Sequence, residues 1–200
     1  MIGIDSAAAI DQYFQVSSDI TKNTAKVCGP DIIKAAATIR DCFKAGGKLM
    51  LCGNGGSAAD CQHMATEFVS RLSKDIQRPG LPALALTTDT SFLTAFSNDF
   101  NYEGLFARQV QALAKTNDVL IGISTSGNSA NVIAAVAEAK KADLQVIGLT
   151  GNGGALAAMA DVSIEVPSDN TQHIQEAHLA IEHILCDLVE NDLYGDGNSQ

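Results

Sequence analysis

Apolar and polar positions alternate along the chain in the two periods that distinguish strands from helices. Short apolar runs bounded by turn residues predict five strands, at 48–52, 83–87, 119–124, 145–150 and 162–166. Between most of these runs the apolar residues recur with helical spacing. Strands that alternate with helices form right-handed crossovers, which make the sheet parallel and cover both of its faces. The pattern therefore predicts an α/β domain with a doubly wound five-stranded parallel sheet.

Three further helices lie at the two ends of the chain. Two amphipathic helices are predicted at 6–27 and 31–45, and Gly46-Gly47 ends the second one. The last helix, predicted at 172–193, carries apolar residues together with His, Gln and Glu on several sides. A helix of that composition usually has more than one neighbour. We expect the first and last helices to pack against other subunits, so that the protein is an oligomer.

Two of the predicted strands end in turns rich in glycine and hydroxyl side chains, and each turn opens a helix. The first turn covers 53–57 (Gly-Asn-Gly-Gly-Ser) and the second covers 124–129 (Ser-Thr-Ser-Gly-Asn-Ser). Such turns let several backbone N–H groups approach a phosphate, which the positive end of the helix dipole favours. Neither turn has the Lys-Ser/Thr pair of a triphosphate loop or the full spacing of a dinucleotide site. The sequence thus predicts a small phosphorylated metabolite as the ligand.

Candidate chemistry lies on the helix after the first turn. His63 and Glu67 are four positions apart and therefore share one face of that helix. They can bind a divalent metal, act as a general acid and base, or do both. The simpler interpretation is an ion pair on the helix surface. Arg71, one turn further, either orients Glu67 or lies on a solvated face. Because ligands bind at the carboxyl ends of parallel strands, we expect 98–101, which follows the second strand, to reach the same edge.

Composition narrows the function classes. The formal net charge of −10 argues against a nucleic-acid surface, because that binding needs Lys and Arg to neutralise phosphates. No apolar run has the length of a membrane span, and residues 1–10 contain no basic leader. The five cysteines are odd in number and have no paired short spacing, as is typical of reduced thiols. We therefore expect a cytoplasmic protein.

A set of motifs extends over nearly the whole chain: 52–60, His63 with Glu67, 123–132, and Ile174-Gln175-Glu176 with His178 and His183. With these motifs the chain closely resembles the bacterial phosphoheptose isomerases of the sugar isomerase (SIS) superfamily. The resemblance implies a single SIS domain over residues 1–200 with a flavodoxin-like sheet, and a homotetramer with sites at subunit interfaces. It also implies zinc, and conversion of sedoheptulose 7-phosphate to D-glycero-D-manno-heptose 7-phosphate, the first step toward lipopolysaccharide heptose.

The resemblance also implies roles for individual residues. Glu67 and His183 match the acid/base pair of the family, and His63, Glu67, Gln175 and His183 match its zinc-associated set. The implied substrate contacts are Asn54, Gly55, Gly56, Ser57, Glu67, Asn98, Asp99, Ser124, Thr125, Ser126, Ser129 and Gln175. The reaction suited to these residues is an aldose–ketose shift through an enediol or enediolate, with Glu67 as first choice for the base.

Helix geometry places a condition on the metal set. Gln175 and His183 are eight residues apart, which on one helix means about 12 Å of rise and a rotation of roughly 80°. Ligation of one ion by both side chains of a single chain would be strained. We therefore expect the site to take these two residues from different copies of the helix.

Other residues of this region have competing interpretations. His173 either contacts substrate or is an exposed histidine at a helix start, and His178 is interpreted as helix surface or subunit packing. Asp169 and Thr171 either touch sugar hydroxyls or cap the last helix.

Two functions besides the enzyme fit parts of the pattern. A replication-initiator-associating protein resembling the same family is a tetrameric binding module, but its helix after the first turn lacks the carboxylate found here as Glu67. A sugar-phosphate-sensing regulatory domain needs the two turns without the acid/base residues. Glu67 together with His183 favours the enzyme.

Overall fold

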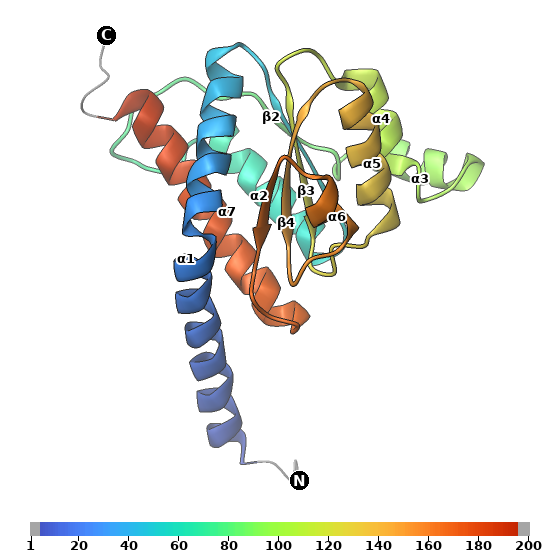
Figure 1. The fold of residues 1–200 in the computed structure, drawn as a ribbon. Helices are drawn as coiled ribbons and strands as arrows, with labels where there is room; N and C mark the ends of the chain where they lie inside the picture. The colour runs from blue at the N-terminus through green and yellow to red at the C-terminus, as the bar shows by residue number, and fades with distance from the viewer. Residues whose placement is uncertain (1–4, 196–200) are drawn as a thin grey trace.

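The structure is a computed structural model that describes residues 5–195. Its centre is a five-stranded, wholly parallel sheet with the strand order β2-β1-β3-β4-β5 (Figure 1). The strands are β1 (Leu49–Gly53), β2 (Ala83–Ala85), β3 (Val119–Ser124), β4 (Gln145–Thr150) and β5 (Val162–Glu165). This confirms the predicted doubly wound sheet, and four of the strands agree with their predicted bounds to within one residue.

Seven helices surround the sheet in the described residues. They are α1 (Ser6–Lys44), α2 (Gly56–Val69), α3 (Thr90–Asp99), α4 (Leu105–Leu113), α5 (Ala130–Lys141), α6 (Ala155–Met159) and α7 (Thr171–Tyr194). Successive residues of a strand point to opposite faces, so Leu49 and Leu51 join the core beneath α1, α2 and α7. Met50 and Cys52 join the second core, beneath α4, α5 and α6. Each face therefore has its own apolar core.

The amino-terminal helix is continuous, and the prediction of two helices was wrong. Pro30 lies inside α1, where it removes one helical hydrogen bond. The buried stripe of α1 runs through this position, from Cys28 to Ile32 and Ala35, and the Cys28 thiol donates to the carbonyl oxygen of Glu165 at 3.2 Å. Because the same packing holds both sides of the proline, tertiary contacts outweigh the local break.

The second strand is shorter than predicted, because it ends at Ala85 instead of residue 87. It is the edge strand beside β1, and past its end the Leu86 N–H still donates to the Leu51 carbonyl oxygen at 2.9 Å. The chain then turns away into α3.

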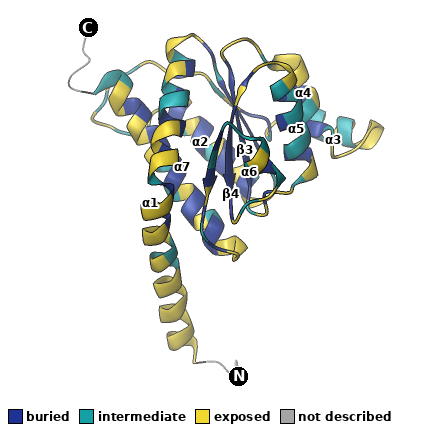
Figure 2. Ribbon diagram, in the orientation of Figure 1, coloured by how far each residue is buried: buried dark blue, intermediate teal, exposed yellow. Residues whose placement is uncertain are grey.

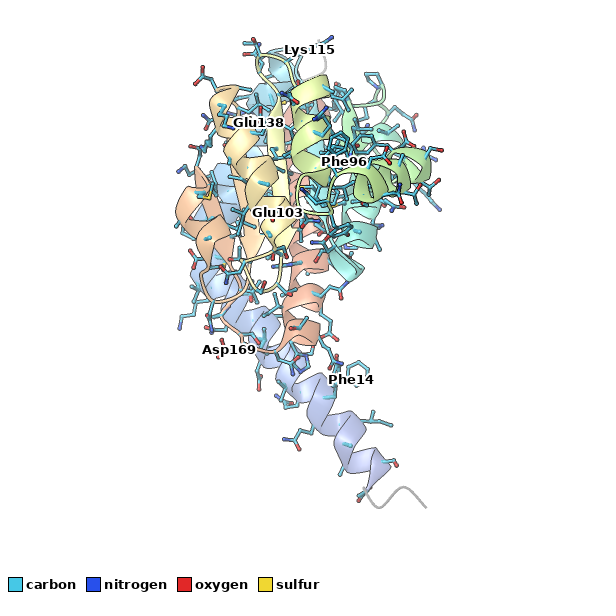
Figure 3. All side chains as sticks on the ribbon, turned by 90° about the vertical axis from the view of Figure 1, so that its right-hand side faces the viewer. Phe14, Phe96, Glu103, Lys115, Glu138 and Asp169 are labelled. Atoms are coloured by element: carbon cyan, nitrogen blue, oxygen red, sulfur yellow. The ribbon has the colours of Figure 1, made fainter. Side chains whose placement is uncertain are left out.

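The first half of α1 extends beyond the rest of the domain and is almost wholly exposed (Figures 1 and 2). It carries large apolar side chains, among them Ile10 (57% exposed) and Phe14 (69% exposed), and Figure 3 labels Phe14 on this projecting part. The hydroxyls of Tyr13 and Ser17 donate to Glu176 at the start of α7, each at 2.6 Å. Among the described residues, no helix combines the length and the apolarity that crossing a membrane requires.

Candidate active site

The two predicted turns lie side by side at the carboxyl edge of the sheet. They follow β1 and β3, which are paired in register up to Gly53 and Ile123. The strand order reverses at this pair, because β2 lies on one side of β1 and β4 lies beyond β3. The point of reversal is where open α/β sheets bind their ligands.

The first turn is tied to the second by a pair of amides. Asn54 and Asn131 donate to each other's side-chain oxygen, both at 2.8 Å, and Asn131 is 3% exposed. Gly55, at the start of α2, has φ of +56°, and no side chain caps the helix. The uncapped N–H groups of α2 therefore remain available to an anion.

The second turn gathers three hydroxyls. Ser124 Oγ lies 2.9 Å from Ser129 Oγ and 3.4 Å from Ser126 Oγ. Gly127 has φ of +65°, and a β-carbon there would lie 2.2 Å from the carbonyl oxygen of Gly153, so only glycine fits. Ser129 begins α5 without capping it. The result is a compact group of hydroxyl and N–H donors suited to phosphate.

The predicted catalytic side chains meet between α7 and α2, the helix that follows the first turn. His63 Nε2 lies 2.8 Å from His183 Nε2, so one ring donates to the other. His63 Nδ1 lies 3.8 Å from Glu67 Oε1, and the three side chains are all half-buried. The structure thus brings His63, Glu67 and His183 together from α2 and α7.

The side chain of Gln175, in α7, packs against the first turn of α2. Its amide Nε2 donates to Asp60 Oδ2 at 3.2 Å, and a β-carbon on Gly56 would lie 2.1 Å from that nitrogen. Gly56 is therefore required for the close approach of α7. Burial raises the pKa of Asp60, while the hydrogen bond from Gln175 opposes that rise.

Gln175 and His183 of one chain both face α2, at Asp60 and His63, which are only three residues apart. Their contacts do not share an atom, but they lie within one turn of α2. This placement weakens the geometric reason for taking the two residues from different copies, and that hypothesis stays a prediction.

The donor set partly fits zinc. Two imidazoles and a carboxylate, from His63, His183 and Glu67, are ligands that zinc prefers. The two ring nitrogens are at hydrogen-bond distance, 2.8 Å, whereas tetrahedral ligation separates them by about 3.3 Å. Within residues 5–195, no group of three His, Cys, Asp or Glu side chains has the geometry of a metal site. Ligation therefore requires the rings to move apart slightly.

Asn98 and Asp99 are not joined to either turn by any hydrogen bond in the described part of the chain. Both are exposed at the end of α3, and the Asn98 amide donates to Asp99 at 2.9 Å. Arg71 is exposed. The arginine that contacts the Glu67 backbone is Arg78, which donates to its carbonyl oxygen at 2.8 Å.

His173 and His178 of α7 are buried, which contradicts the exposed alternative for His173 and the helix-surface alternative for His178. His173 is 5% exposed and lies 3.1 Å from Glu176, and His178 is fully buried with Nε2 3.0 Å from the Thr150 carbonyl oxygen. Both lie on the side of α7 that holds Ile174 and Ala177, so they belong to the buried stripe. Asn170, rather than Asp169 or Thr171, caps the helix, because its side chain accepts from the Gln172 N–H.

Comparison with known proteins agrees with this arrangement. A family model described as SIS domain matches residues 12–151. A phosphoheptose isomerase of Roseiflexus is 51% identical over 181 residues, which is 90% of this chain and 91% of that protein. One from Burkholderia pseudomallei is 59% identical over 151 residues, 75% of this chain and 76% of that protein. The structure of a phosphoheptose isomerase from Francisella tularensis has a TM-score of 0.89 at 40% identity, covering 94% of this chain and 100% of that one.

Proposed function

The chain belongs to the SIS domain family and, within it, to the phosphoheptose isomerases, and from this membership we propose that it converts sedoheptulose 7-phosphate to D-glycero-D-manno-heptose 7-phosphate. The observation that supports this best is the His63–Glu67–His183 group on α2 and α7, because α2 begins at the first of the two turns. Such an arrangement can hold a phosphate at one end of a sugar and move protons at the other. The binding-module alternative gains no support from the named relatives.

Substrate binding follows from the two turns. The hydroxyls of Ser124, Ser126 and Ser129, with the start of α5, hold the phosphate. The Asn54–Asn131 pair and the N–H groups of Gly55 and Gly56 then receive the sugar hydroxyls. In this orientation the carbonyl end points toward α2 and α7.

The reaction is a balanced internal proton transfer. The Glu67 carboxylate removes a proton from C1 of the ketose, the C–H electron pair forms the C1=C2 double bond, and the carbonyl pair moves to O2. His183 passes a proton from O1 to O2, and its ring is held by the bond to His63. Glu67 then returns its proton to C2 as the C1 carbonyl forms. No nucleophile and no oxidant are required.

We also infer that His63, Glu67, His183 and Gln175 would hold a zinc ion. We further infer that the protein is a homotetramer and is cytoplasmic. When bound, zinc supplies a Lewis acid for the enediolate oxygen. Support for the oligomer is the set of exposed large apolar side chains on α1, including Ile10 and Phe14, because exposed apolar patches mark interaction surfaces.

The test is an isomerisation assay on purified protein with sedoheptulose 7-phosphate, with and without a chelator. Glu67→Gln and His183→Ala should each remove most turnover and leave the oligomer, measured by light scattering, intact. Glu138→Gln, on the outer face of α5, is the matched control and should retain activity. Full activity in both site variants would contradict the assigned roles.

A further inference from the structure

Tyr102 reaches the first turn from an exposed segment. It lies in the connection between α3 and α4, and the residue is 57% exposed. Its hydroxyl donates to Asn54 Oδ1 at 2.9 Å, across 48 positions of sequence. Nothing in the sequence motifs or in the proposed reaction uses this residue. An exposed tyrosine bonded to a ligand-binding turn therefore calls for an explanation.

The segment that carries Tyr102 is fixed on both sides. Phe100 stacks on Phe96 of α3 with ring centroids 4.8 Å apart, and the Arg108 guanidinium of α4 lies over both rings. The Asn101 side chain accepts from the Gly104 N–H at 2.7 Å and closes the turn into α4. Figure 3 labels Phe96 on α3 and Glu103 in the connection itself. The Tyr102 hydroxyl is therefore presented to Asn54 from a structured loop.

The bond determines what Asn54 offers to a ligand. An amide oxygen has two lone pairs and an amide nitrogen has two hydrogens. Asn54 Oδ1 accepts from both Tyr102 and Asn131, so its acceptor capacity is filled. Asn54 Nδ2 donates one hydrogen to Asn131. One N–H remains, and its direction is set by the two neighbours.

We propose that Tyr102 is a positioning residue of the sugar-phosphate site, which orients the free N–H of Asn54 toward an oxygen of the sugar. This inference rests on the proposed function. Asn131 alone leaves the pair of amides able to rotate together with the turn, whereas Tyr102 ties the pair to the α3–α4 connection. Because Tyr102 acts through Asn54 and contacts neither Glu67 nor His183 in the described residues, its effect falls on binding rather than on the chemical step.

The test compares Tyr102→Phe with the wild type. Loss of one neutral hydrogen bond corresponds to about a five-fold weaker interaction, so KM and the calorimetric dissociation constant for sedoheptulose 7-phosphate should each rise about five-fold. The turnover number should change by less than about two-fold, because the acid/base residues are untouched. Tyr194→Phe, which removes a phenol hydroxyl at the far end of α7, is the control and should leave both constants unchanged.

A second background separates positioning from direct contact. In an Asn54→Ala protein, Tyr102→Phe should have no further effect on binding, because the residue through which it acts is gone. Unchanged KM and binding in the single variant, or an equal loss in both backgrounds, would overturn the inference. A wild type that binds the sugar phosphate without isomerising it would refute the proposed function and leave this binding test valid. A wild type that does not bind it would overturn both.

Discussion

His178 makes the stability of this fold depend on pH. The ring is fully buried, Nε2 lies 3.0 Å from the Thr150 carbonyl oxygen, and Nδ1 has no hydrogen-bond partner within residues 5–195. Burial lowers the pKa of His178 from 6.5 to about 4, and the bond to Thr150 offsets only part of that shift. In the folded protein the ring is therefore neutral at any pH well above 4.

The sign of the effect follows from linkage. In the unfolded chain His178 takes up a proton as the pH falls through 6.5, whereas the folded chain does so only near 4. A depressed folded pKa means that the stability is complete above 6.5 and is lost progressively toward about 4. With about 1.4 kcal/mol per pKa unit, the loss at pH 5 amounts to about 2 kcal/mol.

Urea unfolding of the wild type and of His178→Gln at pH 7.5 and pH 5.0, at one protein concentration, measures this quantity. Glutamine retains a neutral donor for Thr150 and does not titrate. All other groups are common to both proteins, so the difference between the two pH-dependent losses isolates His178. The wild type should lose about 2 kcal/mol more than the variant. Equal losses in the two proteins would refute the assignment of a neutral buried ring.

Two further predictions concern a buried ion pair and the second turn. Arg78→Met leaves Glu190 buried without its ion-pair partner and should lower the free energy of unfolding by about 3 to 5 kcal/mol. A second change, Glu190→Leu, should restore part of this loss, because Arg78 also donates to the carbonyl oxygens of Glu67 and Phe68. A single variant as stable as the wild type in urea would contradict this. Ser129→Ala removes one hydroxyl of the second turn, to which the phosphate is assigned. The change should raise KM several-fold with a smaller change in kcat, measured by steady-state kinetics. An unchanged KM would place the phosphate elsewhere.

The parts of the fold that depend on local patterns were predictable from the sequence. β3 and β4 have their predicted bounds, because buried strands read as short apolar runs that end in turn residues. The continuity of α1 was not predicted, because Pro30 indicates a break by local rules. The evidence against the break is the stripe Cys28, Ile32 and Ala35, which has helical spacing across the proline and is visible in the sequence.

The site shows the same division. The two turns were identified because each is a continuous motif. The contacts of Asn54 with Asn131 and Tyr102 span 77 and 48 positions, so only the folded chain reveals them. His178 could have been recognised as buried, because Ile174 and Ile181 flank it at helical spacing. Its polarity favoured the interpretation as helix surface or subunit packing instead.

Polar residues lie at the contact between α2 and α7, and function explains them better than stability does. Gln175 bonds to Asp60 and His183 to His63 where apolar side chains would pack without desolvation cost. Next to His183, Glu182 is fully buried, and burial raises its pKa to about 9. Neither of its oxygens has a hydrogen-bond partner within the described chain. Natural proteins keep such costly groups mainly at functional sites, and His63 and His183 belong to the group to which the proton transfers are assigned.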